Sequence, residues 1–208
     1  MTPFSDADGR TAWTSTQKVV AIAVVVAIAA IGVWVVGGAS TEAAGGPQGS
    51  GDAVIQVFTE DDRVPVEPFA GTLLDGQPFD SRDNAGKVVV YNVWGSWCAP
   101  CRTETPALRQ VARETDPEVA FVGINVRDSP EAALAFERSN KVPYPSLTSE
   151  DGANALLAFG SSLGVAAVPT TLVVDPSGRI AGRIVGPTSY STLRGIVDEV
   201  LAGGSPGA

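Results

Sequence analysis

The sequence contains no histidine, a single methionine and only two cysteines among its 208 residues. A structural zinc site takes four nitrogen or sulfur ligands, and a catalytic zinc site takes three together with a water. The two cysteines supply half of such a set, and no histidine is present to supply the rest. The chain is therefore expected to hold no metal, and no pattern in it indicates another cofactor.

Positive charge is also scarce: 14 Lys and Arg stand against 23 Asp and Glu, a net charge of −9. Two basic and two acidic residues precede residue 37, so the remainder has 12 basic and 21 acidic residues and carries the whole net charge. Binding to nucleic acid through phosphates requires a basic face, so that class of function is excluded. The acidic balance favours solubility and attracts basic partners weakly.

Charge is absent from one long stretch near the N-terminus. Val19–Val36 comprises eighteen uncharged residues, nearly all Val, Ala and Ile. As a helix it spans roughly 27 Å, close to the ~30 Å thickness of the hydrocarbon core of a bilayer. With the small residues that follow, we predict a transmembrane helix over 19–39.

The flanking charges predict the orientation of this helix. Arg10 and Lys18 precede it, whereas the first basic residue after it is Arg63. By the positive-inside rule, residues 1–18 are cytoplasmic and the rest is extracytoplasmic, which makes a single-pass signal anchor in the cell membrane. A cleaved signal peptide is the alternative, because Gly37-Gly38-Ala39 offers small residues to a peptidase.

The part beyond the anchor has the length of one domain. Residues 40–60 are predicted to be a flexible linker, because 40–52 form a Gly/Pro/Ser tract with nothing to bury. Residues 204–208 are likewise predicted to be a disordered tail. Residues 61–203 between them suit a single domain with one core.

Within this domain, buried strands alternate with amphipathic helices. Strands are predicted at 87–94, 119–126, 170–174 and 179–185, and helices at 100–115, 130–140, 152–160 and 189–201. This order predicts an α/β fold in which a mixed central sheet is covered by helices on both faces.

The two cysteines, Cys98 and Cys101, lie where the apolar run 87–94 gives way to a helix. With two residues between them, they can close a disulfide without disturbing either element. The unpaired amides and the dipole at the helix start favour a thiolate at Cys98, as a dithiol/disulfide exchange site requires. A purely structural disulfide is the alternative, but a loop this short contributes little stability.

The surrounding residues resemble the thioredoxin superfamily. Residues 92–106 read Asn-Val-Trp-Gly-Ser-Trp-Cys-Ala-Pro-Cys-Arg-Thr-Glu-Thr-Pro, and Val168-Pro169-Thr170 and an Asp-x-x-Gly hairpin follow. More narrowly, residues 65–202 resemble the membrane-anchored, extracytoplasmic TlpA/ResA/CcmG-like thiol–disulfide oxidoreductases. The resemblance implies a thioredoxin-like fold with a redox-active disulfide and an insert near 140–160.

The resemblance also implies roles for individual residues. Cys98, at the exposed helix tip, is expected to be the attacking thiol, and Cys101, facing inward, the resolving thiol. Pro169 is expected to be a cis-proline facing the dithiol, with the backbone of Val168 offered to an extended substrate. Trp97 is expected to line the partner groove. For Pro169, an ordinary loop proline is the alternative.

Two departures from plain thioredoxin bear on the chemistry. Asn92 stands where thioredoxin has a buried aspartate, and it cannot take a proton; it is expected to satisfy a neighbouring backbone group. Glu104, three residues after Cys101, is the compensating candidate, since the matching glutamate in ResA-like proteins tunes the thiol pKa values. A solvated glutamate in the first turn of the helix is the alternative.

The expected function is reduction of protein disulfides. Strong oxidants stabilise their thiolate with a histidine between the cysteines, and this chain has Ala-Pro there. The resemblance implies apocytochrome c as the client, during cytochrome c maturation, and a membrane thiol carrier of the CcdA/DsbD kind as electron donor. A general oxidase or isomerase of secreted proteins is the alternative.

Two other functions on related folds lack their motifs. A peroxiredoxin has Pro-x-x-x-Thr-x-x-Cys, and the residues before Cys98 do not match it. A copper-delivery protein of the Sco kind has C-x-x-x-C together with a distal histidine, and neither is present.

Overall fold

The computed structural model describes residues 53–162 and 167–203. The predicted transmembrane segment 19–39 and the predicted tail 204–208 lie outside the described residues. Within the described ranges, no helix has both the length and the apolar character needed to cross a bilayer.

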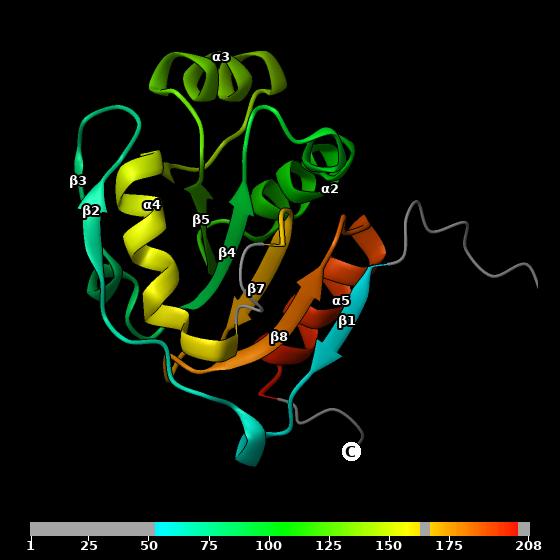
Figure 1. The fold of residues 1–208 in the computed structure, drawn as a ribbon. Coiled ribbons are helices and arrows are strands. Elements are labelled where there is room, and N and C mark those ends of the chain that lie inside the picture. The colour runs from blue at the N-terminus through cyan, green and yellow to red at the C-terminus, as the bar shows by residue number, and fades with distance from the viewer. Residues whose placement is uncertain (1–52, 163–166, 204–208) are drawn as a thin grey trace, which may run out of the picture. The chain divides into compact units, whose positions relative to one another are not determined.

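A six-stranded mixed sheet forms the centre of the domain (Figure 1). Its strands are β1 (Val54–Val57), β4 (Val88–Trp94), β5 (Val119–Asn125), β6 (Ser146–Leu147), β7 (Thr170–Val174) and β8 (Ile180–Val185). They lie in the order β1-β8-β7-β4-β5-β6, with β4 parallel to β5 and antiparallel to β7. A separate hairpin pairs β2 (Ala70–Thr72) with β3 (Pro78–Asp80).

Helices cover both faces of the sheet, as the element order predicts. They are α2 (Ala99–Thr115), α3 (Pro130–Asn140), α4 (Ser149–Ala155) and α5 (Tyr190–Leu201), with 3₁₀ turns η1 (Glu60–Asp62), η2 (Ser81–Asn84) and η3 (Leu156–Ser162). Figure 1 shows α2 and α5 on one side of the sheet and α4 on the other. The helix α3 lies beyond the ends of β4 and β5.

The two sides of β4 explain this arrangement, because side chains alternate along a strand. Val88 and Val90 pack against Leu108 of α2 and Leu193 of α5 in one buried cluster. The alternate residues of β4 pack with α4 and η3 in a second cluster. The strand is thus buried on both faces, which is what its uninterrupted apolar sequence predicts.

The N-terminal boundary of the domain differs from the prediction. Val54–Val57 falls inside the predicted linker 40–60, yet it forms β1 and pairs antiparallel with β8, Val54 opposite Val185. The Gly/Pro tract ends before this segment, and its β-branched residues favour an extended strand. The predicted linker is therefore too long at its C-terminal end.

The insert also differs in detail from the predicted helix 152–160. The helix α4 begins earlier, at Ser149, because the hydroxyl of Thr148 accepts a hydrogen bond from the amide of Asp151 (3.3 Å) and caps it. From Leu156 the chain continues as the 3₁₀ turn η3, in which Gly160 adopts φ 54°. The polar first turn of α4 carries no apolar periodicity, so hydrophobic spacing alone missed its start.

Candidate active site

The two cysteines lie at the junction of β4 and α2. They form a disulfide with a Cα–Cα distance of 5.3 Å. Cys98 is the N-cap of α2, and its sulfur accepts a hydrogen bond from the amide of Cys101 (3.2 Å). An amide donor and the helix dipole both stabilise negative charge on this sulfur, so the geometry favours the thiolate of Cys98 in the reduced state.

The disulfide is more enclosed than the sequence indicated. Cys98 is 3% exposed and Cys101 is 1% exposed. The prediction of an exposed Cys98 is therefore wrong for the disulfide state. The reason is a small apolar cluster around the two sulfurs, in which the loop after β2 contributes Leu74 and the helix α3 contributes Ala133 and Phe136.

The two tryptophans that flank the site differ in burial. Trp94 is 4% exposed, its ring centroid is 4.8 Å from that of Phe136, and its indole N–H donates to the hydroxyl of Ser146 (3.2 Å). Trp97, next to Cys98, is 48% exposed. Its indole N–H donates to the carbonyl of Val126 (3.2 Å), which fixes the ring at the surface beside the disulfide.

The loop before β7 meets the same cluster. The Val168–Pro169 peptide bond is cis, as the resemblance implies. The side chain of Val168 packs against the cluster that holds Cys98 and Cys101. The carbonyl of Pro169 accepts from the amide of Gly186 (2.9 Å), whereas the main chain of Val168 makes no hydrogen bond within 53–162 and 167–203.

Glu104 is a buried acid on α2, 1% exposed. Its Oε1 accepts from the side-chain amide of Asn92 (2.9 Å) and its Oε2 accepts from the backbone amide of Thr188 (2.9 Å). Burial raises the pKa of Glu104 to about 7, and the hydrogen bonds from Thr188 and Asn92 work against that rise. This burial excludes the alternative of a solvated glutamate.

Asn92 has a different contact from the one expected. Its side-chain amide donates to Glu104 and to the hydroxyl of Thr171 (3.1 Å), not to a backbone group. Asn92 is 3% exposed and belongs to β4, so it joins the central strand to the acid on α2.

Asp128 is a site residue that the sequence analysis missed. Its carboxylate accepts from the backbone amide (2.6 Å) and hydroxyl (2.8 Å) of Ser96, and also from Asn125 (3.1 Å) and the amide of Ser129 (3.0 Å). Partial burial opposes the charge, but these donors outweigh it and hold the pKa of Asp128 below its ordinary value. The residue anchors the loop that carries Trp97 and Cys98.

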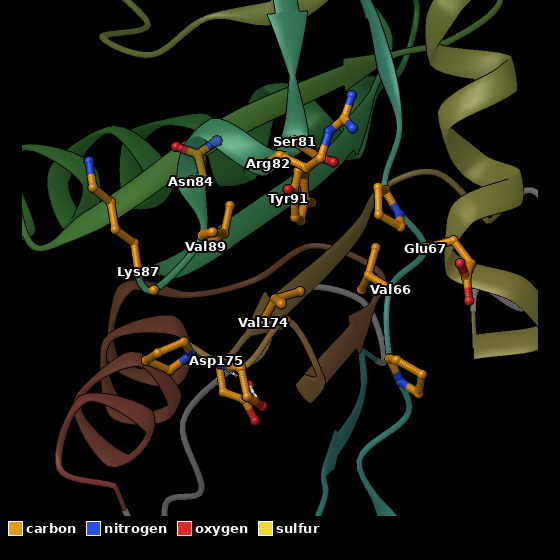
Figure 2. Close-up of a pocket in the computed structure, with 17 residues that line it drawn as sticks. Val66, Glu67, Ser81, Arg82, Asn84, Lys87, Val89, Tyr91, Val174 and Asp175 are labelled. Carbon is orange, nitrogen blue, oxygen red and sulfur yellow. Dashed lines mark hydrogen bonds between the residues drawn. The ribbon is translucent and has the colours of Figure 1, made fainter.

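A cavity of about 260 Å³ lies away from the disulfide. Figure 2 shows Lys87, Val89, Tyr91, Val174 and Asp175 among the residues around it. The cavity lies along the first half of β4, from Lys87 to Tyr91, whereas Cys98 follows the other end of the strand. The cavity therefore takes no part in chemistry at the sulfurs.

Comparisons with known proteins agree with this geometry. The model of the family described as Redoxin matches residues 51–200. The thiol:disulfide interchange protein HelX of Rhodobacter capsulatus is 38% identical over 127 residues, which cover 61% of this chain and 68% of HelX.

Two solved structures are similar over most of their length. One is a DsbF homologue from Corynebacterium diphtheriae, with a TM-score of 0.64 and 33% identity over 74% of this chain and 96% of that one. The other is a thiol:disulfide interchange protein of the thioredoxin family from Chlorobium tepidum, with a TM-score of 0.62 and 32% identity over 67% of this chain and 97% of that one.

Proposed function

We propose that this chain, a thiol–disulfide oxidoreductase that belongs to the Redoxin family, reduces protein disulfides outside the cytoplasm by way of Cys98 and Cys101. The observation that carries the proposal is the position of Cys98. Its sulfur caps α2 and accepts a hydrogen bond from the amide of Cys101, which stabilises its thiolate in the reduced protein, next to the exposed ring of Trp97.

The reaction begins from the reduced dithiol. The thiolate of Cys98 attacks one sulfur of the client disulfide; that S–S bond breaks, a mixed disulfide forms and the other client sulfur leaves as a thiolate. The thiolate of Cys101 then attacks the sulfur of Cys98, and the second client sulfur leaves. Two electrons pass to the client, and the Cys98–Cys101 disulfide is the oxidised product.

The second step requires Cys101 to lose its proton, and Glu104 is suited to accept it. The two residues are three apart on α2 and share one face of the helix. A pKa of about 7 leaves Glu104 partly ionised at neutral pH, in a site without bulk water. Asn92 and Thr188 both donate to the carboxylate and fix its orientation.

The cis-proline loop is the proposed docking site for the client backbone. The main chain of Val168 has no partner within the described residues, and its side chain packs on the disulfide cluster. An extended client segment that pairs with this backbone brings its own sulfur to Cys98. Trp97, the residue before Cys98, supplies exposed aromatic surface beside the attacking thiol.

The sequence supports the direction of electron transfer and the location that we propose. Ala99 and Pro100 between the cysteines give the thiolate no positive charge, which favours the disulfide and makes the couple reducing. The proposed client is an apocytochrome c with a C-x-x-C-H pair, and the proposed donor is a membrane thiol carrier of the CcdA/DsbD kind. Residues 19–39 are proposed to anchor the domain in the cell membrane, facing outward.

Equilibration with glutathione or dithiothreitol buffers tests the direction. The potential should lie nearer the ~−270 mV of thioredoxin than the ~−120 mV of a strong oxidant. The reduced protein should also convert an oxidised C-x-x-C-H peptide to its dithiol, and Cys98→Ser should abolish this. A potential above about −180 mV would make the protein an oxidase or isomerase instead.

A further inference from the structure

An arginine is stacked on the exposed tryptophan beside the disulfide. The guanidinium carbon of Arg127 is 4.9 Å from the ring centroid of Trp97. Arg127 follows β5 and has φ 52°, a left-handed conformation that residues with a side chain seldom adopt. Such conformations concentrate at functional sites, where the surrounding contacts hold them in place.

A second arginine lies in the first turn of α2. Arg102, the residue after Cys101, donates from its guanidinium to the carbonyl of Ser96 (2.5 Å). Neither Arg102 nor Arg127 forms an ion pair with any described residue. Asp128 adjoins Arg127 in sequence and keeps its negative charge, but its oxygens accept from Ser96, Asn125 and Ser129 and pair with neither guanidinium.

Two guanidinium groups without an ion-pair partner among the described residues therefore lie near Trp97, in a chain whose net charge is −9. The acidic remainder of the domain attracts basic partners in general. The guanidinium groups near Trp97 oppose that preference over a small surface. The cation–π contact uses none of the N–H donors of the guanidinium in a hydrogen bond, and two of these donors match the two oxygens of a carboxylate.

We propose that Trp97 and Arg127 select client disulfides flanked by an acidic residue. The client chain crosses the ring of Trp97, and an Asp or Glu next to its cysteine pairs with the guanidinium of Arg127, while Arg102 of α2 adds positive charge beside Ser96. This recognition rests on the proposed function, because it concerns the same exchange at Cys98.

Two peptides test the proposal. Each carries one C-x-x-C disulfide, and they differ only in having Glu or Gln on both sides of it. The rate constant for reduction by the reduced protein is measured for each at low ionic strength. An exposed ion pair contributes up to about 1 kcal/mol, so the Glu peptide should react about fivefold faster. The preference should disappear in high salt, which screens exposed charges.

Variants identify the residue responsible. Arg127→Gln should bring the ratio of the two rate constants to about one, whereas Arg127→Lys should keep part of it because the charge remains. Arg113→Gln is the matched control, since Arg113 is an exposed cation further along α2, and it should leave the ratio unchanged. A ratio that is the same in Arg127→Gln and wild type contradicts the proposal.

The outcomes also separate this proposal from the proposed function. Equal reduction of both peptides by the wild type overturns the recognition alone. Reduction of neither peptide overturns the proposed function, and the recognition falls with it.

Discussion

Glu104→Gln tests whether the buried carboxyl group of Glu104 ionises in the folded protein or serves only as a hydrogen-bond acceptor. The carboxylate is 1% exposed, and burial raises its pKa from 4.5 to about 7. Glutamine has nearly the same shape and keeps an acceptor for the side-chain amide of Asn92. It carries neither the proton nor the charge, and its NH₂ group replaces the oxygen that accepts from the amide of Thr188. The loss of that hydrogen bond lowers the stability of the variant by an amount that varies little with pH, so the pH dependence of the difference reports the ionisation.

The sign follows from the raised pKa. In the folded protein Glu104 holds its proton up to a pH near 7, whereas in the unfolded chain it loses the proton near 4.5. Its contribution to stability is therefore fully present below pH 4.5 and is lost as the pH rises through about 7. The rise from 4.5 to about 7 corresponds to roughly 3 kcal/mol.

The assay is chemical denaturation of the oxidised protein from pH 4 to pH 9, for wild type and Glu104→Gln. The wild type should lose roughly 3 kcal/mol relative to the variant across this range. Thiolate absorbance of the reduced proteins is measured in parallel, and the variant should show a lower apparent pKa for the coupled thiols, because a neighbouring negative charge is gone. Stability curves that stay parallel, with superimposable thiol titrations, would refute the reasoning.

Two further substitutions test the supports of the fold and of the site. Arg63 and Asp175 form a buried ion pair (3.1 Å, both side chains 7% exposed). Arg63→Met leaves the carboxylate without this partner and should lower the free energy of unfolding by about 3 kcal/mol in chemical denaturation. Arg82→Met is the control: it breaks an exposed pair and should leave the denaturation midpoint nearly unchanged. Asp128→Ala removes the acceptor shared by Ser96, Asn125 and Ser129 and should lower the free energy of unfolding by about 2 kcal/mol at pH 6. It should also slow thiol–disulfide exchange at Cys98, because the loop that carries Trp97 and Cys98 is no longer anchored. Since the pKa of Asp128 is held low, this stability difference should shrink as the pH falls below 3.8; a constant difference would contradict the assignment.

Local signals predicted most of the architecture. The apolar run of β4, the capping pattern Ser129-Pro130 and the turn at 175–178 depend on neighbouring residues, so the order of strands and helices could be derived from them. The position of the disulfide followed as well, because two cysteines at a strand-to-helix junction have little freedom.

The remainder depends on contacts between distant segments. Asp128 binds Ser96 across 32 positions, and Leu74 covers the disulfide from a separate hairpin, so neither contact leaves a local pattern. The burial of Glu104 could have been predicted from its spacing along the helix. It lies four and seven residues before Leu108 and Val111, on the apolar face of α2.

The most direct test of the account is a trapping experiment with a disulfide-containing peptide. In Cys101→Ser the resolving thiol is absent, so the mixed disulfide between Cys98 and the peptide should accumulate, as seen by intact mass without reductant. In Cys98→Ser no adduct should form, because within the described residues no amide donates to the sulfur of Cys101, whereas the sulfur of Cys98 caps α2. An adduct that forms on Cys98→Ser as fast as on Cys101→Ser would contradict the assignment of Cys98 as the attacking thiol.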